Sequence, residues 1–155
     1  MLFQLALDAG EINDLIALAR RVAQWVDWIE VGTPLIKKHG VNLVTRVKNA
    51  LPGHVIVADM KTADAGGWEA DMAMDAGADV FTVLAAASDA TVREAMAHAN
   101  QRGRKIVVDL IGQPDPIARA MQLAAFKPHY FNLHRSTDAF SSGAELRVDL
   151  IREFT

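Results

Sequence analysis

The chain has no cysteine among its 155 residues. This absence excludes disulfides, thiolate metal ligands and a cysteine nucleophile, and it agrees with a cytoplasmic location. No apolar run approaches the roughly 18 uncharged residues that a membrane span needs. The first four residues, Met1-Leu2-Phe3-Gln4, lack the basic segment that opens a signal peptide. We therefore expect a cytoplasmic protein.

An excess of charge of one sign is also missing. The chain has 16 Lys and Arg against 19 Asp and Glu, for a net charge of -3. A nucleic-acid-binding domain usually has an excess of basic residues, and this chain has none. Hydrophobic residues make up 51% of the chain, which is enough for a sizeable core. We expect residues 1–155 to form a single domain.

Short apolar runs recur at nearly regular intervals along the chain. They read as continuous rather than alternating apolar segments, which is typical of parallel strands covered on both faces. Helix signals lie between them: Thr33 before Pro34 and Asp115 before Pro116 predict helix starts, and Ser88 or Asp89 can cap a further helix. The predicted strands cover residues 2–7, 28–31, 55–58, 80–84, 106–108 and 130–133.

Glycines and polar residues mark the other boundaries. Gly77 and Gly103 suit left-handed helix stops. We expect the polar segment 136–143 to be a loop, followed by a final helix over about residues 144–153. Alternating strands and helices predict a parallel α/β architecture.

The positions of charged and polar residues favour a barrel over an open, doubly wound sheet. Asp8, Glu30, Asp59, Asp109 and His134 lie at or near the ends of five different predicted strands. A barrel gathers such groups on one face, whereas an open sheet uses one switch point, usually beside a Gly-rich phosphate loop. The chain has no such loop. We predict a (β/α)8 TIM-barrel fold shortened to about six strand–helix units, without counterparts of strands seven and eight.

The segment after the third predicted strand is the strongest candidate for chemistry. Asp59, Lys61 and Asp64 follow the apolar residues 55–58 with the spacing D-x-K-x-x-D. Burying charge is costly unless the charge is paired or binds a ligand or metal. Three charges at the mouth of a buried strand therefore predict an active site.

Four segments resemble the 3-hexulose-6-phosphate synthase family of the orotidine 5'-monophosphate decarboxylase superfamily. The resemblance covers nearly the whole chain, in order. The segments are Gln4-Leu5-Ala6-Leu7-Asp8, Ile29-Glu30-Val31-Gly32-Thr33-Pro34, Ala58-Asp59-Met60-Lys61-Thr62-Ala63-Asp64-Ala65-Gly66 and Val108-Asp109-Leu110-Ile111.

The resemblance implies a metal-dependent aldol reaction between ribulose 5-phosphate and formaldehyde. Glu30 and Asp59 would bind Mg²⁺ or Mn²⁺, since carboxylate oxygens suit these ions. Lys61 would stabilise the enediolate, and His134 would transfer protons. Asp109 would act with them in catalysis.

The same resemblance supplies the remaining roles. Asp8 would be catalytic and would also orient substrate hydroxyls, while Thr33, Lys61 and Arg135 would bind substrate. Asp64 would reach into the site of a second subunit, so the resemblance implies a homodimer with shared active sites.

Two alternatives remain open from the sequence. The related 3-keto-L-gulonate 6-phosphate decarboxylases would use the same metal and enediolate chemistry. Pro34 and Asp109 favour the synthase, whereas His134-Arg135-Ser136 followed by Asp138 is more similar to the decarboxylase. The other alternative is a non-catalytic barrel fragment, because the strands whose loops commonly bind phosphate in this fold have no counterpart.

Overall fold

The computed structural model describes residues 1–143 and 148–154 and contains one parallel sheet. The strands follow chain order across the sheet, so each lies beside its predecessor. A doubly wound sheet reverses its strand order at a switch point, and no reversal occurs here. The six strands are β1 (Gln4–Leu7), β2 (Trp28–Val31), β3 (Val55–Thr62), β4 (Val80–Leu84), β5 (Lys105–Asp109) and β6 (Tyr130–Asn132).

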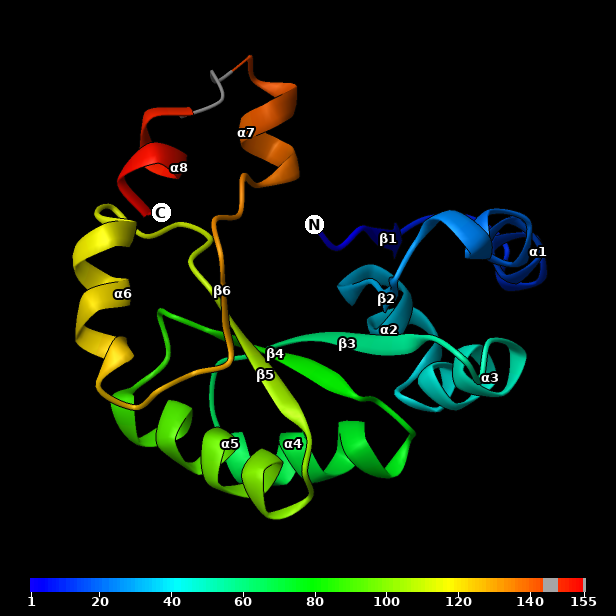
Figure 1. Ribbon diagram of the computed structural model, residues 1–155, viewed down its shortest axis with the longest axis horizontal. Coiled ribbons are helices and arrows are strands. Elements are labelled where there is room, and N and C mark those ends of the chain that lie inside the picture. Colours follow the sequence, from blue (N-terminus) through cyan, green and yellow to red (C-terminus); the bar gives the residue numbers. More distant parts are fainter. Residues whose placement is uncertain (144–147, 155) are drawn as a thin grey trace.

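Helices connect successive strands and lie around the outside of the sheet (Figure 1). No helix in the described part of the chain is long and apolar enough to cross a membrane. The helices are α1 (Ile12–Val22), α2 (Thr33–His39), α3 (Asn42–Ala50), α4 (Gly66–Asp75), α5 (Asp89–Gln101), α6 (Pro116–Ala124), α7 (Thr137–Ser141) and α8 (Val148–Phe154), with a 3-10 turn at Ala23–Trp25.

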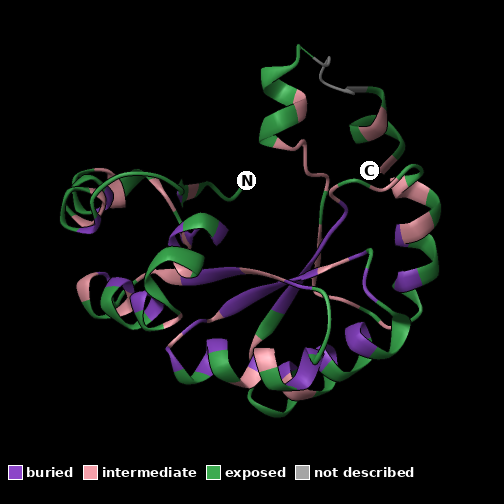
Figure 2. Ribbon diagram, turned by 180° about the vertical axis from the view of Figure 1, so that it is seen from behind, coloured by how far each residue is buried: buried purple, intermediate pink, exposed green. Residues whose placement is uncertain are grey.

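The two faces of the sheet bury different sets of side chains. One face packs against the helices, and residues on it such as Ile29, Phe81 and Ile106 are fully buried. Figure 2 shows long buried stretches in the central strands. The other face forms a smaller apolar cluster around Val57, Val80 and Val107. We call the face of this cluster the inner face. Because strand side chains alternate between faces, the residues two positions after Val57, Val80 and Val107 also lie on the inner face.

Contacts across the inner face show that the sheet curves into an incomplete barrel. The Trp28 ring on β2 meets the Tyr130 ring on β6 edge to face, with ring centroids 5.1 Å apart. Three strands separate β2 from β6, which in a flat sheet would place them about 19 Å apart at about 4.8 Å per strand. The six-unit barrel predicted from the sequence is therefore confirmed.

Most of the helix signals are confirmed. Ser88 accepts a hydrogen bond from the Thr91 N–H (3.1 Å), and Asp115 accepts one from the Ala118 N–H (2.9 Å). Gly77 and Gly103 follow α4 and α5 with φ of 99° and 63°.

Two local predictions are wrong. Gly32, not Thr33, precedes the first residue of α2, so Thr33 is not the N-cap. The segment 136–143 contains the short helix α7, which Ser136 caps through the Ala139 N–H. The predicted start of the last helix at 144 lies outside the described residues, and the described helix α8 runs over Val148–Phe154.

Candidate active site

The centre of the site is an irregular stretch of β3. The strand continues through Asp59 to Thr62 rather than ending at 58 as the sequence suggested. From Ala58 to Thr62, β3 advances four residues while β4 advances only from Phe81 to Val83. Within this stretch Lys61 has φ 47°, a left-handed conformation that non-glycine residues rarely adopt. Bulges and backbone strain of this kind occur preferentially next to active sites.

Asp59 is a buried carboxylate with several hydrogen-bond donors around it. It is 4% exposed. Oδ1 accepts from the Thr82 hydroxyl (2.7 Å), and Oδ2 lies 2.6 Å from the Thr33 hydroxyl and against the Lys61 ammonium. Burial alone would raise the pKa of Asp59, but the hydrogen bonds from Lys61, Thr33 and Thr82 outweigh it and lower this pKa. Asp59 is therefore held as an anion.

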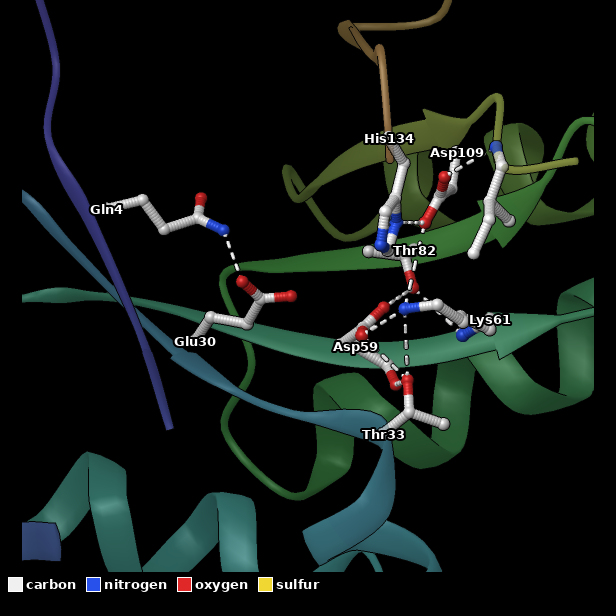
Figure 3. A network of polar contacts seen from close by, with 9 residues as sticks. Gln4, Glu30, Thr33, Asp59, Lys61, Thr82, Asp109 and His134 are labelled. Atoms are coloured by element: carbon white, nitrogen blue, oxygen red, sulfur yellow. Dashed lines mark hydrogen bonds and ion pairs between the residues drawn. The ribbon is translucent and has the colours of Figure 1, made fainter. Parts of the chain in front are cut away.

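Lys61 joins two carboxylates from different strands (Figure 3). Its ammonium contacts Asp59, lies 3.2 Å from the Thr33 Oγ1 and lies 3.7 Å from the Asp109 Oδ2. The Lys61 side chain is 21% exposed, so it is not fully enclosed. Lys61 thus places a positive charge between the two carboxylates.

The second half of the site is a carboxylate–imidazole pair. His134 follows β6, and its Nδ1 lies 2.7 Å from Oδ2 of Asp109, the last residue of β5. Asp109 Oδ1 accepts from the Ile111 N–H (2.9 Å), which fixes the carboxylate. The hydrogen bond to Asp109 raises the pKa of His134 above its ordinary value, although burial acts in the opposite direction.

Glu30 lies to one side of this cluster, on the inner face of β2 (Figure 3). Its Oε2 accepts a hydrogen bond from Gln4 Nε2 at 2.6 Å. Burial, and then the negative charges of Asp59 and Asp8, raise the pKa of Glu30, with Gln4 opposing them. The carboxylates are near enough to repel one another, and this repulsion is what a bound cation would relieve.

Three further predicted residues have different surroundings. Asp64 is exposed in the turn between β3 and α4. The Arg135 guanidinium stacks on the Phe140 ring of α7, 4.6 Å from its centroid. Asp8 lies beside Gly32, where an added Cβ would come 2.0 Å from the Asp8 Oδ1 and 2.7 Å from the Leu7 backbone carbonyl oxygen, so a side chain at position 32 would require the backbone to shift.

Comparison with known proteins identifies the family. The profile of the orotidine 5'-phosphate decarboxylase / HUMPS family matches residues 1–147. The chain belongs to this family. It is 43% identical over 138 residues to 3-hexulose-6-phosphate synthase of Mycobacterium gastri, covering 89% of this chain and 67% of that protein.

Solved structures of family members agree with the fold. One is 3-hexulose-6-phosphate synthase from Salmonella typhimurium, with a TM-score of 0.93 and 34% identity over 98% of this chain and 72% of that one. Another is 3-keto-L-gulonate-6-phosphate decarboxylase from Vibrio cholerae, with a TM-score of 0.87 and 34% identity over 98% and 71%. The chain is thus a six-unit barrel of this enzyme family, similar to its synthases and decarboxylases.

The structure adds two residues that the sequence analysis did not identify. Thr82 lies within the apolar run 80–84, where strand propensity alone explains a threonine. The two-residue period of the strand places it on the face of Val80, toward Asp59, and that signal could have identified it. Gln4 lies in β1 on the same face, and only its contact with Glu30 shows a role.

Proposed function

We propose that this chain is an aldolase that condenses formaldehyde with ribulose 5-phosphate to give hexulose 6-phosphate. The observation that carries the proposal is the charged inner face, where the Asp59–Lys61 pair and the Asp109–His134 pair are linked through Lys61. Two known synthases and the family assignment support the same chemistry. We further propose that residues 1–155 act as one domain in the cytoplasm.

The reaction needs one proton to leave carbon 1 of the ketose and one carbon–carbon bond to form. Electrons from the broken C–H bond make an enediolate, which the Lys61 ammonium stabilises electrostatically. The enediolate carbon then bonds to the formaldehyde carbon, and the resulting alkoxide takes up a proton. With Nδ1 of His134 held by Asp109, Nε2 is the nitrogen that exchanges protons with substrate.

The residues present suit a divalent cation, which we propose to be Mg²⁺ or Mn²⁺. In residues 1–143 and 148–154, no three or more His, Asp or Glu side chains gather as a complete metal site. Mg²⁺ needs only one or two carboxylates, with water and substrate oxygens completing its shell. Glu30 and Asp59 would hold the ion. Burial is the first cause of the raised pKa of Glu30, and the negative charges of Asp59 and Asp8 add to it; the ion would offset this added repulsion. When bound, the ion would polarise the sugar carbonyl.

We propose Thr33, Arg135 and Asp8 as further substrate contacts, and a homodimer in which Asp64 reaches the partner's site. The exposed position of Asp64 agrees with this role. Four residues after Asp64, on α4, Trp68 is 75% exposed and borders a groove of about 470 Å³ between α3 and α4. Trp68→Glu is expected to shift a dimer toward monomer in analytical ultracentrifugation. Trp25→Glu, at a similarly exposed tryptophan (66%), is the control; equal effects would contradict the assignment.

The second candidate is decarboxylation of 3-keto-L-gulonate 6-phosphate. It is favoured by the structural likeness to the Vibrio cholerae decarboxylase and by the segment His134-Arg135-Ser136. Both reactions pass through an enediolate, so the same charged face would serve either.

The first test is calorimetric titration of the protein with ribulose 5-phosphate, with and without Mg²⁺, followed by assays for formaldehyde consumption and for carbon dioxide release. We expect metal-dependent binding and formaldehyde consumption, abolished by Lys61→Ala but not by Lys38→Ala at an exposed position of α2. Carbon dioxide release without formaldehyde consumption would replace the first function with the second. If the protein shows no binding and no turnover, we conclude that the chain is a non-catalytic barrel.

A further inference from the structure

Thr82 lies between the two catalytic candidates of β3. Its side chain projects from β4, the neighbouring strand, and the residue is only 3% exposed. Thr82 Oγ1 lies 2.7 Å from Asp59 Oδ1 and 2.9 Å from the backbone N of Lys61 (Figure 3). One hydroxyl therefore contacts both members of the Asp59–Lys61 pair.

The direction of these two hydrogen bonds follows from the groups involved. A backbone N–H can only donate, so the Thr82 oxygen must accept from Lys61. The single hydroxyl proton is then available for the ionised Asp59, which can only accept. The arrangement leaves no choice of hydroxyl orientation, so it holds both groups at once.

The irregularity in β3 explains why this hydroxyl is needed. Between Ala58 and Thr62 the strand leaves its regular register with β4, and Lys61 adopts φ 47°. A bulged residue loses its ladder partner, and a buried backbone N–H without a partner is costly. Thr82 supplies a side-chain oxygen in place of the missing backbone carbonyl.

We propose that Thr82 is the positioning residue of this site: it holds the bulged backbone at Lys61 and the carboxylate of Asp59 in one fixed arrangement. It acts through these two groups and not on the substrate. The proposal rests on the proposed function for its kinetic consequence, whereas its structural consequence is independent of any activity.

The test compares Thr82→Val, which keeps the shape and removes the hydroxyl, with Thr82→Ser, which keeps the hydroxyl. In the formaldehyde assay, Thr82→Val is expected to lower kcat by about 10- to 100-fold, the usual cost of removing a residue that orients a ligand-holding group. KM for ribulose 5-phosphate should change little, and Thr82→Ser should restore most of kcat. Rates are normalised to the folded fraction measured by circular dichroism.

Thr62→Val is the matched control. Thr62 is equally buried, at 1% exposed, and its hydroxyl also binds a carboxylate, that of Glu69, outside the cluster. Its variant should keep kcat. If Thr82→Val fails to fold, Thr82→Ala and Thr82→Ser replace it as a pair that differs only in the hydroxyl.

A second readout does not need activity. In amide NMR spectra, the Lys61 N–H should exchange with solvent faster in Thr82→Val than in the wild type, and Thr82→Ser should restore its protection. If the wild type shows no turnover, the proposed function fails, and this readout still decides the role of Thr82. Unchanged Lys61 exchange in folded Thr82→Val overturns the proposal, as does an unchanged kcat in an active enzyme.

Discussion

Replacing Lys61 with methionine should destabilise the protein in a way that a second substitution repairs. The change keeps a long side chain and removes the charge opposite Asp59, which is 4% exposed. Removing one partner of a buried ion pair costs about 3–5 kcal/mol, because the other charge remains buried. The Thr33 and Thr82 hydroxyls still solvate Asp59, so we expect the lower end, about 3 kcal/mol. That is a large fraction of a typical folding free energy of about 5–15 kcal/mol.

The converse substitution should cost less. The Lys61 side chain is 21% exposed and its ammonium lies 3.7 Å from Asp109, so in Asp59→Asn the cation would keep contact with water and a counter-charge. We expect Asp59→Asn to lower the free energy of unfolding by about 1 kcal/mol, the usual scale for a hydrogen bond. The double variant should be more stable than Lys61→Met alone, because no charge is left uncompensated at position 59.

Urea denaturation followed by tryptophan fluorescence measures these differences at pH 7. The pH dependence gives an independent check. The native pKa of Asp59 is lowered, so its contribution to stability is present above the ordinary pKa of 3.8 and is lost as the pH falls through the native pKa. Lys61→Met loses one of the hydrogen bonds that lower the pKa of Asp59, so this pKa should be higher in the variant than in the wild type, and the deficit of Lys61→Met should shrink as the pH falls toward it. A Lys61→Met variant within about 0.5 kcal/mol of wild type at pH 7 would refute the reasoning.

Two further predictions concern His134 and the packing of α4 on α5. Asp109→Asn should lower the pKa of His134 in an NMR titration, because the hydrogen bond to Asp109 is the main cause of its raised value; the stability from this pair, present below about pH 6.5, is lost as the pH rises through the native pKa. An unchanged His134 titration would contradict this. Gly66→Ala should destabilise the fold by about 1–3 kcal/mol in urea, because its Cβ would come 2.1 Å from the Thr91 carbonyl oxygen. Gly67→Ala, which meets only a movable side chain, should cost less, and equal losses would argue against the clash.

Much of the fold follows from local sequence signals. The apolar runs at 28–31 and 80–84 match β2 and β4: β4 is buried on both faces, and β2 buries Ile29 and Val31 on one face and half-buries Trp28 and Glu30 on the other. Ser88 and Asp115 cap helices through their own side chains, so short-range chemistry predicts those helix starts. Thr33 has the same chemistry but donates to Asp59 instead, because tertiary contacts can override a local preference.

The site was predicted less completely, for identifiable reasons. The resemblance supplied the roles of Asp59, Lys61, Asp109 and His134, and the structure brings these four residues together. Thr82 was missed because a threonine in an apolar strand looks ordinary unless its neighbours across the sheet are known. The role of Asp64 stays a prediction, since it concerns a second subunit that a single chain does not contain.

The inner face of the barrel has two layers with separate tasks. Trp28, Val57, Val80 and Val107 form an apolar layer, and the residues two positions further along the same strands are Glu30, Asp59, Thr82 and Asp109. Each of these four strands therefore carries one residue in the apolar layer and, two positions later, one in the polar layer, on a common backbone. Protein engineers could exploit this separation: substitutions in the apolar layer tune robustness, and substitutions two residues later retune reactivity. The two properties can then be selected in separate libraries.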